Sequence, residues 1–164
     1  MMKDTQITVT EADLSLPGHQ TVVLDLLNAY AMDPMGDGQP LSESARRDVI
    51  PGLREHPTTL VFLAYLDEEA VGFAICFRGF STFAARPLLT ISDYFVSAKH
   101  RGLGIGPQLL RGIEKKARDL GCCLVTLAVQ ENNHLARRVY SAAGYSQAVH
   151  SPEAGGALYL CKPL

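Results

Sequence analysis

The feature that most constrains how this chain can fold is a glycine-rich turn between a β-prone run and an amphipathic segment. The turn reads His100-Arg-Gly-Leu-Gly-Ile-Gly106 and follows the apolar run 88–96. In the next segment, 105–120, apolar residues recur every three or four positions, which predicts a helix with one buried stripe. That stripe comprises Ile105, Leu109, Ile113, Ala117 and Leu120. Pro107 falls in the first helical turn, where its missing N–H costs nothing.

A second apolar run turns this part of the chain into a β-α-β unit. Gly121 is expected to end the helix. Residues 122–129, which follow it, are apolar except for Thr126, and the polar residue Gln130 comes next. Such a run is typical of a strand buried on both faces. The two strands are therefore expected to be parallel, with a right-handed crossover. Gly112 disfavours the helix, because glycine in a helix interior costs about 1 kcal/mol relative to alanine.

The rest of the chain adds elements that predict an α/β (α+β) domain with a mixed sheet. Further strands are expected at 6–10, 58–66, 71–77, directly after Tyr145 and at 157–162, with a loop at 79–86. Further helices are expected at 21–32, at 42–54 with Ser42 as its cap, and from an Asn132 or Asn133 cap to Ala143. No linker or repeat divides the sequence, so residues 1–164 are expected to form one domain.

Composition argues against several classes of protein. The chain has 164 residues, but no apolar stretch reaches the roughly 18–20 residues of a membrane-spanning helix. A net charge of −2 gives no general attraction for nucleic acid or acidic membranes. The N-terminus lacks the apolar core of a signal peptide, so a cytoplasmic location is expected. The cysteines lie in apolar runs without metal-ligand spacing, which predicts buried thiols and no metal site: Cys76, Cys122, Cys123 and Cys161.

The glycine turn itself predicts a binding site for a phosphate group. Gly102, Gly104 and Gly106 let the backbone approach a ligand closely, and the helix that follows supplies unpaired N–H groups. Arg101 adds a permanent cation. A P-loop would need Lys-Ser/Thr, which is absent, and a Rossmann turn would need glycine where Pro107 stands. A turn that only connects strand and helix is another alternative, but three glycines and an arginine exceed what a connection needs.

At this turn the sequence resembles the GNAT superfamily of acetyl-CoA-dependent N-acetyltransferases. The family motif Arg/Gln-x-x-Gly-x-Gly/Ala stands here as Arg101-Gly-Leu-Gly104-Ile-Gly106, preceded by Asp93-Tyr-Phe-Val96. The likeness covers residues 88–146, and over the N-terminal 60 residues only the layout matches. It implies a mixed, mostly antiparallel sheet of six to seven strands, with a splayed central parallel pair and about four flanking helices. It also implies acetyl-CoA as co-substrate without a metal, and a homodimer by analogy.

A second motif downstream supports the same resemblance. Asn133-His-Leu-Ala136-Arg-Arg-Val-Tyr140-Ser-Ala-Ala-Gly144-Tyr145 resembles the family pattern Asn-x-x-Ala-x3-Tyr-x3-Gly-Phe/Tyr. Helical spacing puts Asn133, Ala136 and Tyr140 on one face, where Ala136 leaves room for the pantetheine arm and Asn133 can bind its amides. Tyr140 is the candidate acid that protonates the leaving sulfur. A tyrosine that only fills the core is the alternative.

The resemblance also implies roles for the strand before the turn. Backbone groups of Phe95 and Val96 are expected to pair with pantetheine as an added strand would, with an N–H near Val96 polarising the acetyl carbonyl. Asp93 is the candidate for guiding deprotonation of the amine, or it only binds the amine or caps a strand. The expected donor site is completed by Arg101, Gly102, Leu103, Gly104, Ile105, Gly106, Asn133 and Tyr140.

The acceptor is expected to be a primary amine of a small molecule, diamine-like, polyamine-like or amino-acid-like. The expected acceptor pocket mixes aromatic and acidic residues: Tyr30, Asp33, Met35, Asp37, Phe80, Phe83 and Asp93. The segment from Gly79 to Val96 resembles the diamine and polyamine branch, but Ser92-Asp93 stands where that branch has Glu-Asp. The alternatives are an acetyltransferase acting on a protein or peptide amine, a non-catalytic acyl-CoA sensor, and a nucleotide-phosphate binder.

Overall fold

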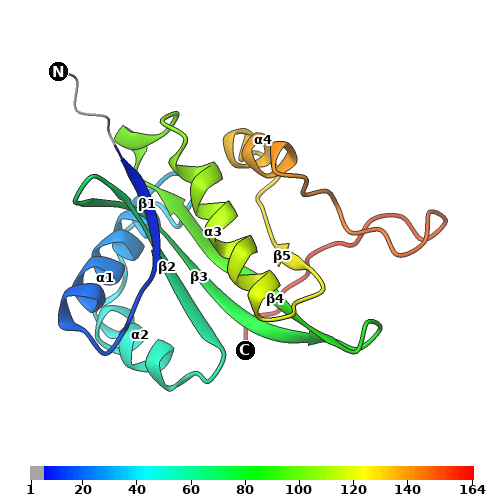
Figure 1. Ribbon diagram of the computed structural model, residues 1–164, viewed down its shortest axis with the longest axis horizontal. Coiled ribbons are helices and arrows are strands. Elements are labelled where there is room, and N and C mark those ends of the chain that lie inside the picture. Colours follow the sequence, from blue (N-terminus) through cyan, green and yellow to red (C-terminus); the bar gives the residue numbers. More distant parts are fainter. Residues whose placement is uncertain (1–5) are drawn as a thin grey trace. The chain divides into compact units, whose positions relative to one another are not determined.

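The computed structural model describes residues 6–164, which fall into two compact units. The first unit ends at Leu127, and the second runs from Ala128 to Leu164. The first holds the sheet and three α-helices, and the second holds one α-helix (Figure 1). The single domain expected over residues 1–164 stays a prediction.

The first unit is built on a sheet whose strand order is β1-β2-β3-β4-β5. The strands are β1 (Ile7–Glu11), β2 (Thr59–Leu66), β3 (Glu69–Ser81), β4 (Arg86–Val96) and β5 (Val125–Leu127). Neighbours are antiparallel except for the parallel pair β4 and β5. The mixed sheet and its β-α-β unit are thereby confirmed. The expectation of six to seven strands was wrong, because residues 6–164 form only five.

The helices begin and end close to their expected positions. They are α1 (Pro17–Met32), α2 (Glu43–Glu55), α3 (Ile105–Asp119) and α4 (His134–Ala142), with a short 3₁₀ turn η1 (Ala98–His100). α1 begins before the expected Thr21, because Pro17 occupies the first turn, where its fixed φ suits a helix. Ser42 caps α2 as expected, its hydroxyl accepting from the Ala45 N–H at 3.1 Å.

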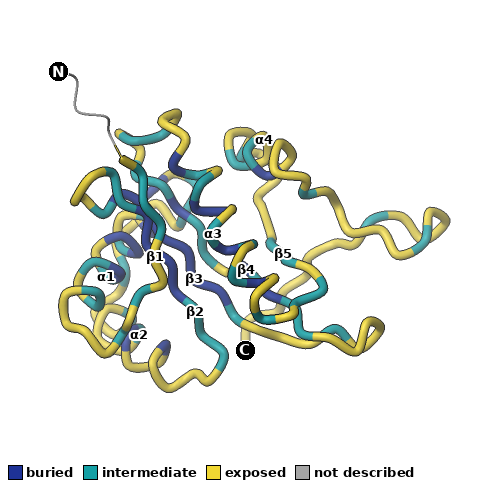
Figure 2. Tube along the Cα trace, viewed as in Figure 1, coloured by how far each residue is buried: buried dark blue, intermediate teal, exposed yellow. Residues whose placement is uncertain are grey.

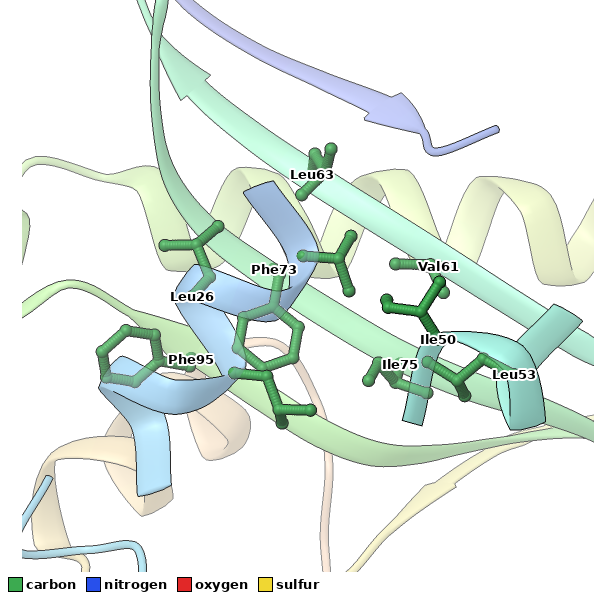
Figure 3. Packing of buried hydrophobic residues seen from close by; sticks show 10 residues of the cluster. Leu26, Ile50, Leu53, Val61, Leu63, Phe73, Ile75 and Phe95 are labelled. Carbon is green, nitrogen blue, oxygen red and sulfur yellow. The ribbon is translucent and has the colours of Figure 1, made fainter. Parts of the chain in front are cut away.

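The two faces of the sheet are covered by different helices. α1 and α2 pack on one face and α3 on the other (Figures 1 and 3). The core under α1 and α2 consists of Val23, Leu26, Leu27, Ile50, Leu53, Val61, Leu63, Phe73, Ile75 and Phe95. On the other face, α3 buries the predicted stripe from Ile105 to Ala117 (Figure 2). Leu120, the last residue of that predicted stripe, is the C-cap of α3 and is only half-buried. The burial of these apolar residues holds both layers to the sheet.

Gly112, which disfavours the helix by propensity, is explained by packing. A Cβ at this position would lie 2.7 Å from Val9 Cγ1 on β1. Glycine therefore allows α3 to lie close to the edge of the sheet. This contact is non-local, which is why helix propensity alone gave no reason for it.

Two expectations, one for the β3–β4 hairpin and one for β5, are corrected. β3 extends to Ser81 and β4 begins at Arg86, so the expected loop 79–86 shrinks to 82–85. β5 covers only Val125–Leu127 of the expected strand 122–129 and is half-buried. It pairs with only three residues of β4, and Thr126 bonds the Thr90 hydroxyl at 2.9 Å. The apolar run 122–129 is thus longer than the part of it that pairs in the sheet.

The second unit, from Ala128, contains α4 but neither of the two strands expected there. Only an isolated bridge between Val149 and Gly156 forms. The segment 157–162 finds no ladder partner among residues 6–164 and is coloured as exposed in Figure 2. Its apolar side chains Leu158, Tyr159 and Leu160 are exposed. A strand needs a neighbouring edge to pair with, and the residue types of a segment do not show whether that edge exists.

The cysteines are all free thiols, but their expected burial holds for one of them. Cys76 is buried, Cys122 and Cys123 are half-buried, and Cys161 is exposed. Burial, with a smaller effect of the Asp93 charge, raises the pKa of the Cys76 thiol to about 12. Cys76 is therefore a core residue without a reactive thiolate.

Candidate active site

A β-bulge in β4 decides which face Asp93 occupies. Ile75 pairs with Asp93 and Cys76 with Ile91, so Ser92 is an extra residue without a partner. Cys76 and Ile91 lie on the α3 face, whereas Ile75 belongs to the core under α1 and α2. Without the bulge, Asp93 would share the face of Ile91. The bulge instead places Asp93 and Phe95 beside α1.

The glycine turn has the backbone geometry that a phosphate-binding loop requires. Gly102 and Gly104 have φ values of 81° and 84°, in the left-handed region that favours glycine. Gly104 is the N-cap of α3, and no atom lies within 4 Å of the position a Cβ would take on either glycine. The Ile105 side chain is buried in the core, so the turn is anchored while its backbone stays open. The first N–H groups of an α-helix have no acceptor within the helix, so the start of α3 has the donors that an anion-binding site needs.

The second half of β4 has a free edge next to this turn. β5 pairs only with Leu89, Thr90 and Ile91, so residues 93–96 pair with β3 alone, and the bulge residue Ser92 has no strand partner. The Ser97 N–H donates to the Val71 carbonyl at 2.8 Å, which shows that Ser97 and Val71 form a hydrogen-bonded pair of the antiparallel ladder. Hydrogen-bonded pairs alternate along antiparallel strands, so Val96 turns its backbone groups outward and Phe95 turns its own toward β3. Of the two residues expected here, Val96 offers the free N–H.

Arg101, at the start of the turn, is held by three contacts. Its Nη2 donates to Asp33 Oδ2 at 2.6 Å, and its Nε donates to the Val96 carbonyl at 2.9 Å. The guanidinium carbon lies 5.6 Å from the centre of the Phe95 ring, a cation–π distance. The Arg101 side chain therefore faces Asp33 at the end of α1.

Tyr30 and Asp93 lie on the same face of the sheet, and the charge of Asp93 acts on the Tyr30 hydroxyl. The Tyr30 ring lies 5.6 Å from Phe95 and 6.3 Å from Phe73, centre to centre. Burial raises the pKa of Tyr30, and the charges of Asp93, Asp33 and Asp37 raise it further. Burial alone raises the pKa of the Asp93 carboxyl. Asp93 is thus a stronger proton acceptor than an exposed aspartate.

Asp33 differs from Asp93 because its charge is compensated. Burial would raise the pKa of Asp33, but bonds from the Met35 N–H and from Arg101 bring it below its ordinary value. Asp33 also ends α1 as its C-cap, ahead of Pro34. It was expected in the acceptor pocket, and the structure places it against the glycine turn.

Phe80 and Phe83 are not brought together with Tyr30 and Asp93. Phe80 pairs with Pro87 at the far end of the β3–β4 hairpin, and Phe83 is exposed in the turn that joins the strands. From Pro87 to Asp93 the chain runs roughly 20 Å along β4, at about 3.3 Å per residue. Of the residues expected at the acceptor pocket, the structure groups Tyr30 with Asp93, and Asp33 and Asp37 are close enough to affect the pKa of Tyr30.

The second motif forms a well-defined helix in the unit from Ala128. Asn133 caps α4, its Oδ1 accepting from the Ala136 N–H at 3.1 Å, which decides between the two expected caps. Tyr140 is buried, and its ring lies 5.9 Å from that of Tyr145. The roles of Asn133 and Tyr140 toward acetyl-CoA stay predictions.

Two kinds of feature are absent from residues 6–164. No helix there is long and apolar enough to cross a membrane. The same residues contain no group of three or more His, Cys, Asp or Glu side chains that could hold a metal ion.

Comparison with known proteins identifies the family. A profile of the Acetyltransferase (GNAT) family matches residues 23–145. That is most of the chain, which therefore belongs to this family. The match includes both the glycine turn and the helix that carries Tyr140.

Individual relatives are similar over shorter segments. An uncharacterized N-acetyltransferase of Archaeoglobus fulgidus is 36% identical over 97 residues, 58% of this chain and 63% of that protein. A thialysine N-epsilon-acetyltransferase of Bos taurus is 32% identical over 74 residues, 45% of this chain and 43% of that protein. The match therefore spans less than two thirds of either relative.

A solved structure shows the same fold over the whole chain. It is an aminoglycoside N-acetyltransferase in complex with CoA, with a TM-score of 0.73 and 15% identity. The superposition covers 100% of this chain and 99% of that one. At this identity the likeness concerns the fold alone.

Proposed function

We propose that this chain is an N-acetyltransferase that transfers the acetyl group of acetyl-CoA to a primary amine of a small cationic molecule. The observation that carries the proposal is the glycine turn beside the free edge of β4. Two left-handed glycines precede the start of α3, and the outward backbone of Val96 lies at the adjoining strand. Family membership over residues 23–145 supports this choice of donor.

The residues present fit the two polar parts of acetyl-CoA. The backbone N–H groups of residues 102–106 would bind the diphosphate, because the turn leaves them open and the α3 N-terminus is positive. The outward carbonyl of Val96, which also accepts from Arg101 Nε, would bind a pantetheine amide as an added strand does, and its N–H is left for the acetyl carbonyl. A role for Asn133 in binding the arm is supported by the family motif alone.

Acetyl-CoA supplies an activated thioester, and the chain must move two protons. The amine nitrogen bonds to the carbonyl carbon, and the carbon–sulfur bond breaks as the thiolate leaves. Asp93 would accept the proton that the amine loses, directly or through water, and its raised pKa suits that task. Tyr140 would give a proton to the departing sulfur. The Val96 N–H would stabilise negative charge on the carbonyl oxygen.

The charge around Tyr30 favours a cationic acceptor. Asp93 and Asp37 both act on Tyr30, and neither has a cationic partner among the described salt bridges. An ammonium group would supply the missing positive charge. The bovine thialysine N-epsilon-acetyltransferase, a sequence relative, has an amine in its name, which supports a diamine-like, polyamine-like or amino-acid-like substrate.

The test is turnover with a panel of amines. Purified protein is incubated with acetyl-CoA and, separately, a diamine, a polyamine, thialysine, an aminoglycoside and a peptide with a free N-terminus. Acetylated product is detected by mass spectrometry, because the chain's exposed Cys161 would add to a free-thiol signal. We expect product from at least one small amine. Binding of acetyl-CoA without any product would favour an acyl-CoA sensor. Product from the peptide alone would favour a protein acetyltransferase. Absence of acetyl-CoA binding would overturn the proposal.

We also propose a homodimer. The exposed apolar side chains of Leu158, Tyr159 and Leu160 support it, because a second copy could bury them. Light scattering after size exclusion should give twice the chain mass, and Leu160→Asp should reduce it to one. A wild-type monomer at high concentration would contradict this. The cytoplasmic location expected from the sequence stays a prediction.

A further inference from the structure

Both carboxylate oxygens of Asp33 already accept hydrogen bonds within the protein, so neither is free to bind the ammonium group of an amine substrate. Its Oδ2 accepts from Arg101 and its Oδ1 from the Met35 N–H at 2.9 Å. Its backbone carbonyl accepts from the Gly36 N–H at 2.8 Å. The side chain is only 8% exposed. An ammonium ligand would have to displace an ion pair that is already formed, so Asp33 is poorly suited to bind the acceptor.

The same contacts change what Arg101 can contribute to the turn. Its permanent charge is matched by Asp33, and its Nε is committed to the Val96 carbonyl. The affinity of the turn for a diphosphate then depends mainly on backbone N–H groups, which must be held in place. Arg101 is the residue from which the turn begins, and its side chain fixes that point to β4 and to α1.

Removing one member of this pair should affect the other. Arg101 is 32% exposed and Asp33 almost fully buried, so an unpaired Arg101 would turn toward solvent more easily than Asp33 could. Once Arg101 turns away, its bond to Val96 is lost as well. The turn would then sample conformations in which its N–H groups no longer converge.

We propose that Asp33 is a positioning residue of the donor site, which holds Arg101 and thereby the glycine turn in the conformation that binds the CoA diphosphate. This inference rests on the proposed function. It reassigns Asp33 from the acceptor pocket, where the sequence placed it, to the donor side.

The test measures the dissociation constant of acetyl-CoA by calorimetry, together with Michaelis constants for both substrates. Asp33→Asn keeps the size of the side chain and can still accept from Met35, but it removes the charge. We expect about tenfold weaker acetyl-CoA binding, equal to about 1.4 kcal/mol, with the KM of the amine within about twofold of wild type. Arg101→Leu, which removes both side-chain hydrogen bonds, should weaken binding similarly, and the double variant should be no weaker than Arg101→Leu alone.

The matched control is Asp25→Asn, which removes an exposed carboxylate of α1. It should bind acetyl-CoA like wild type. If Asp33→Asn binds acetyl-CoA like wild type, or raises only the KM of the amine, Asp33 is not a donor-site residue. If wild type itself fails to bind acetyl-CoA, the proposed function falls first.

Folding is followed by thermal unfolding of each variant. Should Asp33→Asn not fold, the double variant replaces it, because it leaves no buried charge unpaired. A folded double variant that binds acetyl-CoA like wild type would overturn the inference, whereas about tenfold weaker binding would support it.

Discussion

At the scale of single residues, Tyr140 carries the sharpest chemical prediction. Tyr140→Phe keeps the buried ring but removes the proton donor, so kcat should fall roughly a hundredfold while acetyl-CoA affinity changes little. Rapid kinetics and calorimetry measure the two quantities. Tyr145→Phe is the matched control, because the family pattern accepts either ring there and the two rings are neighbours. Full activity of Tyr140→Phe would remove Tyr140 from the mechanism.

Asp93 links activity to stability through its raised pKa. Because the folded state binds this proton more tightly than the unfolded chain does, stability is lost as pH rises from the ordinary carboxyl pKa through the raised folded value. Asp93→Asn should therefore weaken this pH dependence and raise the Tm at neutral pH, by roughly 2–4 °C. It should also lower kcat/KM strongly.

Melting curves across a pH series, with Asp25→Asn as control, check this expectation. Asp25 is exposed on α1, so its replacement should leave the Tm unchanged. An Asp93→Asn variant that is less stable than wild type at neutral pH would mean that Asp93 has a compensating partner.

At the scale of elements, the packing of α3 on β1 predicts an unusual response to alanine. Gly112→Ala should destabilise the fold by about 1–3 kcal/mol, because the new methyl group would meet Val9, although alanine is the better helix former. Gly52→Ala in α2 is the control: nothing lies within 4 Å of its Cβ position, and it should stabilise by up to about 1 kcal/mol. Urea unfolding measures both. Equal stabilisation by the two changes would refute the close contact.

Elements set by local sequence were predictable, and those set by pairing were not. The α3 stripe, its glycine terminator and the Ser42 cap each depend on residues within a few positions, and all three were found. β5 and the segment 157–162 needed an edge to pair with. The apolar residues of a segment cannot specify that edge, so the lengths of both strands were overestimated.

The candidate site divides in the same way. The glycine turn was visible in the sequence as a motif. The bulge at Ser92, which places Asp93 on the α1 face, has no such sequence signal, because the residue types of β4 do not show where an extra residue interrupts the pairing. The pairing of Asp33 with Arg101 joins residues 68 positions apart. The sequence indicated that Asp33 and Arg101 both belong to the candidate site, but it did not indicate that they form an ion pair.

At the scale of the whole molecule, the central claim is that the chain takes its acetyl donor through the glycine turn. Gly104 and Gly121 stand at opposite ends of α3, both with positive φ and nothing within 4 Å of a Cβ. Alanine at either position should cost about 1–2 kcal/mol of stability, since a left-handed conformation disfavours a side chain. Only Gly104 belongs to the turn.

The decisive measurement is the dissociation constant of acetyl-CoA for wild type, Gly104→Ala and Gly121→Ala. We predict saturable binding to wild type, about tenfold weaker binding to Gly104→Ala, and binding within about twofold of wild type for Gly121→Ala. Absence of binding to wild type, or equal binding by the two variants, would contradict the claim.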